Sequence, residues 1–149
     1  MGNSIIKFVF MAVAMVAFLS QAVAQDKTDL SGVVVLVGTS NADGSTDQYM
    51  VNMNDGSVFH NKGEDDAEFV GKFDSEEMTA IQEELGQLNY KEVSMTHKDG
   101  KAYHYLIVMG HGHEYSMSWN EKGTTPIQNF YTHVHNRCSL LRSDYSIAY

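Results

Sequence analysis

The sequence predicts an α+β domain in which a mostly antiparallel sheet of four or five strands carries two helices packed on one face. Runs of β-branched and aromatic residues alternate with turn-forming segments, as in consecutive strands. Two other segments repeat apolar residues every three or four positions, the spacing of amphipathic helices. The connections between neighbouring strand segments are short, which favours antiparallel pairing. Two amphipathic helices can then cover one face of the sheet.

The first half of the domain is predicted to form the earlier strands. Residues 33–37 are apolar at every position and lie between glycines, which indicates a buried strand. Residues 48–53 alternate apolar and polar side chains, and residues 57–60 resume the strand pattern. Asp55-Gly56 between them predicts a tight hairpin, because glycine adopts the positive φ of such a turn. Residues 69–73 could add a short extended piece.

Both helices have recognisable starts. Asp74 with Glu77 three residues later fits an N-cap and its N3 partner, and Thr125 with Gln128 repeats the arrangement. Pro126 fits the first helical position. The predicted apolar stripes are Met78, Ile81, Leu85 and Leu88 in the first helix, and Ile127, Phe130, Tyr131, Val134, Cys138 and Leu141 in the second.

The second hairpin is predicted from residues 101–109 and 114–119. The first of these strands is apolar on both faces, with Tyr103, Tyr105, Ile107 and Met109 on one and Ala102, Leu106 and Val108 on the other, interrupted by His104. If both helices lie on one side, the second face carries apolar surface that marks a partner or self-association site. The alternative is that the tail or the N-terminal lead-in covers it.

The N-terminus has the pattern of a secretory signal peptide over residues 1–24. Lys7 precedes an apolar stretch, residues 8–19, and Ala22-Val23-Ala24 fits a signal peptidase site, so cleavage is expected before Gln25. The remaining chain divides into a lead-in (25–31), one α+β domain (32–142) and a tail (143–149). We therefore expect a secreted or periplasmic protein that meets the membrane only through its signal peptide before cleavage.

Composition and the absence of known motifs argue against two classes of function, nucleic-acid binding and catalysis. The chain has 19 acidic against 10 basic residues, and such a surface repels phosphate backbones, so no nucleic-acid partner is expected. No Gly-x-Ser-x-Gly, His-Glu-x-x-His or phosphate-binding glycine loop occurs, and no enzymatic activity is predicted. The single Cys138 lies on a helix stripe, where a buried small apolar side chain is expected. Oligomeric state is left open.

Turn placement suggests a family. In chain order the pattern is the Asp55-Gly56 hairpin, Phe69-x-Gly71-x-Phe73, Ser75-Glu76-Glu77 and Leu85-x-x-Leu88-x-Tyr90. A second hairpin and a helix that begins at Pro126 come after it. Over residues 32–141 this resembles the small emfourin-like inhibitors of thermolysin-type metalloproteases and related uncharacterised exported domains. In that family the loop after the first strand enters the protease cleft.

The resemblance implies a non-enzymatic, protein-binding module, with a protease inhibitor as its specific form. The partner would be a protein such as a protease. The partner-binding loop would then contain Gly38, Thr39, Ser40, Asn41, Asp43 and Gly44.

An alternative function is the binding of a divalent metal, Zn²⁺ or Cu²⁺. His111 and His113 straddle Gly112, and if the strand continued through them both rings would point to one side. His104 on the pairing strand is the candidate third ligand. The competing interpretation is an exposed turn. In the last helix, His133 and His135 are expected on different faces, His133 at the edge of the core and His135 toward solvent.

Overall fold

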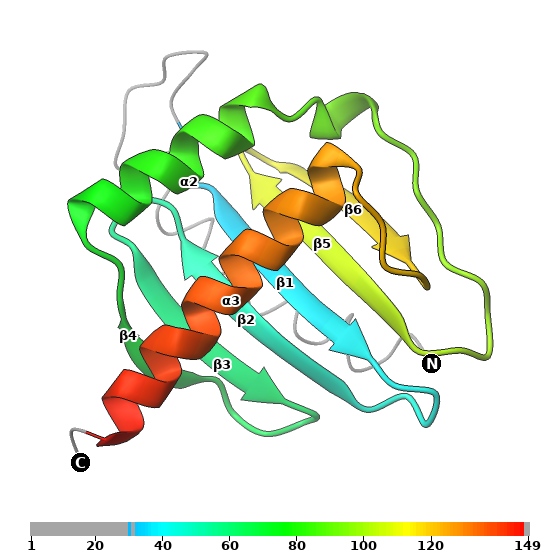
Figure 1. Ribbon diagram of the computed structural model, residues 1–149, viewed down its shortest axis with the longest axis horizontal. Coiled ribbons are helices and arrows are strands. Elements are labelled where there is room, and N and C mark those ends of the chain that lie inside the picture. The colour runs from blue at the N-terminus through cyan, green and yellow to red at the C-terminus, as the bar shows by residue number, and fades with distance from the viewer. Residues whose placement is uncertain (1–29, 31, 148–149) are drawn as a thin grey trace.

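The computed structural model describes residues 30 and 32–147, which form an α+β domain built on one six-stranded antiparallel sheet (Figure 1). The strand order is β4-β3-β2-β1-β5-β6. The fold class is as predicted, but the sheet has six strands rather than four or five. The strands are β1 (Val34–Ser40), β2 (Thr46–Asn52), β3 (Ser57–Lys62), β4 (Glu68–Lys72), β5 (Tyr103–Gly110) and β6 (His113–Trp119).

The additional strand is the short edge strand β4, where the sequence indicated only an extended piece. It pairs with β3 through a register that shifts between Val58 and Phe59. Val70 points into the core and is 1% exposed, whereas its neighbour Phe69 is 43% exposed. An edge strand needs hydrogen bonds on one side only, so five residues are enough to extend the sheet.

The two main helices begin where their caps predict. Helix α2 (Ser75–Gln87) starts after Asp74, whose carboxylate accepts from the Glu77 N–H at 2.8 Å. Helix α3 (Pro126–Ile147) starts after Thr125, whose hydroxyl accepts from the Gln128 N–H at 3.3 Å, while Gln128 Oε1 accepts from the Thr125 N–H at 3.3 Å. A short 3₁₀ helix, η1 (Tyr90–Glu92), follows α2.

Helix α3 extends further than the sequence suggested. It continues to Ile147, so residues 143–147, expected as a tail, form its last turns. The ring of Tyr145 packs edge-on against Phe69 of β4, with 6.1 Å between ring centroids. The last turns of α3 therefore lie against the edge of the sheet instead of trailing away from it.

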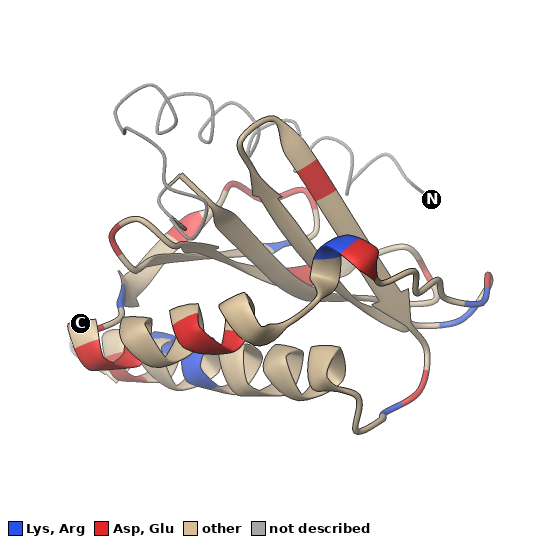
Figure 2. Ribbon diagram, turned by 90° about the horizontal axis from the view of Figure 1, so that it is seen from above, with Lys and Arg blue, Asp and Glu red and all other residues tan. Residues whose placement is uncertain are grey.

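Both helices lie on the same side of the sheet (Figure 2), as predicted. The main core fills the space between them and the sheet. Its buried apolar residues include Val35, Val37, Val51, Met53, Ile81, Leu85, Leu106, Val108, Met117, Phe130, Val134 and Cys138. The burial of Cys138 in this core was expected, and it raises the pKa of the thiol.

The opposite side of the sheet, called the second face below, carries a smaller apolar cluster. Its buried members are Val34, Leu36, Met50, Tyr105, Ile107 and Met109, and the partly buried Phe59 and Tyr103 pack against them. The two-faced strand predicted for residues 101–109 is thus confirmed in β5.

Gly38 shapes the centre of the second face. The Tyr105 ring lies over this glycine and its hydroxyl donates to Gln48 Oε1 on the far side of β1, at 2.6 Å. A Cβ on residue 38 would lie 2.5 Å from Tyr105 Cζ and 2.7 Å from Gln48 Cβ. Only glycine at residue 38 therefore allows the Tyr105 ring to cross β1. Gly38 thus has a packing role in the sheet.

Among the residues described, no helix is both long and apolar enough to span a bilayer. The signal peptide predicted for residues 1–24 lies outside the described residues, as does the lead-in apart from Leu30. Cleavage before Gln25 and export therefore stay predictions.

Two glycine substitutions test the role of Gly38. Gly38→Ala should lower the free energy of unfolding by about 1–3 kcal/mol, because the methyl group overpacks against Tyr105 and Gln48. Gly86→Ala is the matched control, since a Cβ there meets no atom within 4 Å and the residue is helical. It should raise stability by about 0.5–1 kcal/mol through helix propensity. Urea unfolding measures the free energy of unfolding of both variants. An equal change in the two variants would contradict the packing role of Gly38.

Candidate functional site

The connection between β1 and β2 forms an exposed, internally hydrogen-bonded loop, called the tip below (residues 41–45). The Asn41 N–H donates to the Ser45 carbonyl at 2.8 Å, and the Gly44 N–H donates to the Asn41 carbonyl at 2.9 Å. The Asp43 carboxylate accepts from the Ser45 N–H at 2.9 Å and from its hydroxyl at 2.6 Å. These bonds lower the pKa of Asp43. The tip thus has a defined shape although it projects into solvent.

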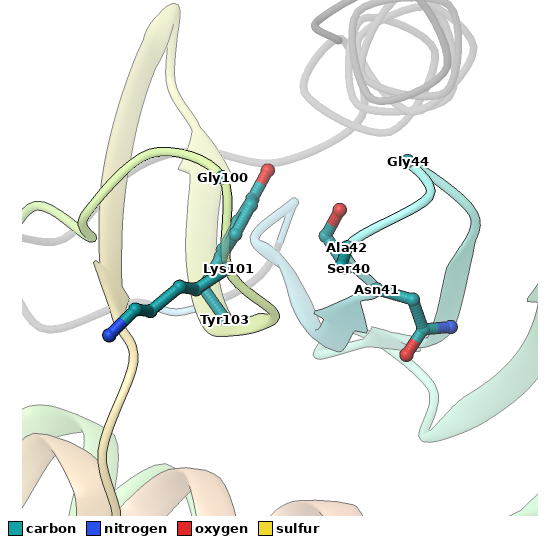
Figure 3. A pocket seen from close by; sticks show the side chains of 7 residues that line it. All are labelled: Ser40, Asn41, Ala42, Gly44, Gly100, Lys101 and Tyr103. Carbon is teal, nitrogen blue, oxygen red and sulfur yellow. The ribbon is translucent and has the colours of Figure 1, made fainter.

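A small pocket lies between the tip and the segment that enters β5 (Figure 3). Its walls are Ser40, Asn41, Ala42 and Gly44 on the tip side and Gly100, Lys101 and Tyr103 on the other. In Figure 3 the Lys101 side chain points away from the tip. The His97 ring stacks on the Tyr103 ring, with 3.5 Å between the ring centroids and 8° between the ring planes. His97 is itself held by Ser118, whose Oγ lies 2.8 Å from the His97 Nδ1.

The predicted partner-binding loop is only partly available to a partner. Asn41, Asp43 and Gly44 belong to the tip, as expected. Gly38, Thr39 and Ser40 instead belong to β1, so their assignment to a loop is wrong. Ser40 is only 4% exposed. The strand continues past Gly38 because these residues pair on both sides, with β2 and with β5.

The three histidines proposed as metal ligands do not converge. His111 (φ 52°) and Gly112 (φ 78°) form the turn between β5 and β6, and this turn ends the strand that would have aligned His111 with His113. His113 pairs with Gly110, whereas His104 pairs with Trp119 at the other end of the hairpin. Six residues of strand separate the two ends by roughly 20 Å.

No group of three or more His, Cys, Asp or Glu side chains in residues 30 and 32–147 is arranged to hold a metal ion. The geometry of the described chain therefore does not assemble the Zn²⁺ or Cu²⁺ site that the histidine spacing suggested.

The structure brings together a different set of side chains beneath α3, called the polar cluster below. It lies on the helix side of the sheet, at the strand ends that lead to the tip. Its members are Thr39, Asp47, Tyr49, His60, His104, Tyr131 and His135.

One half of the polar cluster centres on the Tyr131 hydroxyl. It donates to the Gly38 carbonyl at 3.1 Å and lies 3.2 Å from both Thr39 Oγ1 and His104 Nδ1. Thr39 Oγ1 and His104 Nδ1 are themselves 3.2 Å apart. Burial raises the pKa of Tyr131 and lowers the pKa of His104, which the positive charge of Lys122 lowers further. These groups therefore join α3 to the central strands in their neutral forms.

The other half centres on a histidine–aspartate pair. His60 is 5% exposed, and its Nε2 lies 2.7 Å from Asp47 Oδ1. Its ring packs on Tyr49 with 4.9 Å between centroids. His135 contacts Tyr49 edge-on at 5.3 Å and stacks on Tyr131 at 5.6 Å. The prediction that His135 faces solvent is wrong, because α3 crosses the sheet with this position turned toward Tyr49.

The two helix histidines do point to different sides, as predicted. His133 faces α2, where its Nδ1 lies 2.7 Å from Glu84 Oε1 and its Nε2 lies 3.2 Å from Glu77 Oε1. Arg137 Nε also contacts Glu77 Oε1, at 3.2 Å. His133 and Arg137 of α3 therefore both lie against carboxylates of α2.

The polar cluster does not form a nucleophile with an oriented base. Thr39 is next to His104, but the contacts of His104 described above involve a phenol and a hydroxyl, without the carboxylate that orients the base in a catalytic triad. The carboxylate pairs instead with His60. The chemistry of this arrangement is attachment of α3 to the sheet, with a response to protonation.

Comparison with known proteins adds no assignment. No known protein family matches the sequence, and no curated protein matches it significantly. The tip, the pocket and the polar cluster are therefore interpreted from their own geometry.

The polar cluster predicts a loss of stability in acid. Burial lowers the pKa of His104 and His135 below 6.5, so the unfolded chain binds protons more readily than the folded one. Stability should be constant above about pH 7 and decrease as the pH falls below about 6.5.

Thermal or urea unfolding between pH 7 and pH 5 measures this slope. His135→Gln should reduce this slope, and the matched change His113→Gln, at an exposed position of β6, should leave it unaltered. An unchanged slope in His135→Gln would contradict the assignment.

Proposed function

We propose that this protein is an exported, non-enzymatic module that binds another protein through the tip and its adjacent pocket. The observation that carries the proposal is the combination of solvent exposure and internal order in residues 41–45. Asn41, Ala42, Asp43 and Ser45 are all exposed, yet two backbone hydrogen bonds and the Asp43–Ser45 contacts fix their conformation. A loop ordered before binding loses little conformational entropy in the complex, which favours affinity.

The surroundings of the tip support recognition of a polypeptide. The pocket beside it presents the Tyr103 ring, already held by His97, next to the exposed Lys101. Tyrosine is enriched in protein interfaces because it combines apolar area with a polar end. The tip also offers backbone groups, a carboxylate and short polar side chains, so a peptide segment could contact both walls.

The polar cluster supplies the rigid base that such a loop requires. Thr39 and Asp47 stand at the strand ends on either side of the tip, and both are tied to side chains beneath α3. A binding loop is most precise when the elements that carry it are fixed by packing and hydrogen bonds. The strand ends therefore support the tip from below.

Inhibition of a thermolysin-type metalloprotease is the specific form that we propose for this binding. It rests on the resemblance in turn placement and on the position of the tip directly after the first strand, the place from which a projecting loop can enter a protease cleft. The inhibited enzyme would be exported alongside this protein.

The test compares two alanine-to-arginine variants. Ala42→Arg places a long cation on the wall of the pocket without removing any hydrogen bond described for the tip, and it should weaken partner binding roughly tenfold or more. Ala67→Arg makes the same change in the β3–β4 connection, away from the pocket, and should bind as the parent does.

The parent protein is first assayed against a panel of thermolysin-type proteases and used to capture exported proteins from its host. Affinities of the captured partner for the parent and both variants follow by calorimetry. Absence of both inhibition and capture, or equal weakening by the two variants, would overturn the proposal.

A further inference from the structure

An open groove, called the helix groove below, lies between the end of α2 and the beginning of α3. In Figure 1 these two helix ends lie together at the top of the view, whereas the tip lies at the lower right. The helix groove has a volume of about 550 Å³. Natural ligand sites have volumes of about 300–1,000 Å³. None of the residues that line the helix groove belongs to the tip, its pocket or the polar cluster, so it is a separate candidate site.

The lining of the helix groove combines apolar and polar side chains. The buried Phe130, the half-buried Leu88 and the exposed Pro126 contribute its apolar surface. Gln87 and Asn129 add two exposed amide groups. A concave apolar lining with a few polar groups is the usual composition of a binding site. The helix groove therefore suits a ligand that has an apolar part.

The α2 side of the helix groove is negatively charged. Helix α2 contains four glutamates, Glu76, Glu77, Glu83 and Glu84, and no lysine or arginine. Glu83 and Glu84 lie near its C-terminal end, where the helix dipole already places partial negative charge. Basic groups are the ones that stabilise this end of a helix, and the last turn of α2 has none.

The described chain compensates this charge only in part. Glu84 Oε1 contacts His133 Nδ1 at 2.7 Å, whereas Arg137 contacts Glu77 nearer the start of α2. Within residues 30 and 32–147, no lysine or arginine forms an ion pair with Glu83 or Glu84. The Glu84 side chain lines the helix groove and is 41% exposed. A cation in the groove can therefore reach this carboxylate.

We propose that the helix groove binds a segment of a partner polypeptide in which a lysine or arginine stands beside an apolar side chain. The cation pairs with Glu84 at the negative end of α2, and the apolar side chain packs on Leu88, Pro126 and Phe130. A long basic side chain suits this lining, because its aliphatic stem packs on apolar surface while its charged end reaches a polar group.

Charge and shape together favour a basic polypeptide over other occupants. The chain has a formal net charge of −9, which attracts basic segments and repels acidic ones. A free amine would pair with Glu84 but would leave the apolar lining uncovered. A purely apolar segment would place no cation at the exposed carboxylate. Only a segment with both features uses both parts of the helix groove.

The experiment uses the full chain, labelled with ¹⁵N and expressed in a host that exports it. The probe is the capped tripeptide acetyl-Leu-Arg-Leu-amide. Acetyl-Leu-Glu-Leu-amide reverses its charge, and n-butylammonium supplies a cation without a polypeptide. The side-chain amides of Gln87 and Asn129 line the helix groove and report binding through their NMR chemical shifts. The expected result is a saturable shift of both amides with the arginine probe, and little shift with the other two.

Two glutamate-to-glutamine variants locate the cation. Glu84→Gln removes the carboxylate charge but keeps an oxygen beside His133, and it should weaken binding of the arginine probe roughly fivefold or more. Glu83→Gln is the matched control, because it makes the same change at the neighbouring exposed residue, which does not line the helix groove. This control should bind the probe as the parent does.

Each other outcome overturns the proposal. Unshifted Gln87 and Asn129 amides in the arginine titration would show that the helix groove does not bind basic peptides. Equal shifts with the glutamate probe would leave only apolar contact, and equal shifts with n-butylammonium would indicate a site for free amines. Equal weakening in Glu83→Gln and Glu84→Gln would indicate general attraction to an acidic domain. Ala42→Arg alters the tip and leaves the helix groove unchanged, so this proposal and the proposed function fail separately.

Discussion

The two-sided burial of the central strand β1 is the constraint on which the rest of the structure depends. Its residues pair with β2 on one side and β5 on the other, and residues 33–37 are at most 4% exposed. Such a strand is stable only when both of its faces are covered. The helices and the main core cover one face, and the apolar cluster of the second face lies on the other.

The last residues of β1 connect this scaffold to the tip. Gly38 allows the Tyr105 ring to cross the strand on one face, while its carbonyl accepts the Tyr131 hydroxyl from the helix side. The Thr39 hydroxyl contacts the Tyr131 hydroxyl on the helix side. Ser40 is the last residue of β1 that pairs with β2, and the tip begins after it. Three consecutive residues thus serve packing, helix attachment and loop support. This explains why they are unavailable as a binding loop.

The same arrangement places two titratable histidines where α3 packs on the sheet. His104 and His135 both lie between the sheet and this helix, in contact with Tyr131. Placing two protonated imidazoles in this confined space would add positive charge where burial already disfavours it. The Asp47 carboxylate opposes this effect for His135, but it is paired with His60. We therefore expect the support of the tip to weaken in acid together with the fold.

What the sequence determined by itself was local. The caps at Asp74 and Thr125 and the Asp55-Gly56 hairpin follow from interactions between residues close together in the chain, and the two-faced strand β5 follows from its run of apolar residues. The structure confirms all of them. What only the tertiary structure decided was which distant residues meet. Strand register separated His104 from His113 and placed His60 opposite Tyr49, and the crossing of α3 turned His135 inward. Hydrophobic periodicity and secondary-structure propensity specify the face of an element on which a side chain lies. Strand register and helix orientation depend instead on packing throughout the core. For this reason the polar cluster could not be predicted from spacing alone.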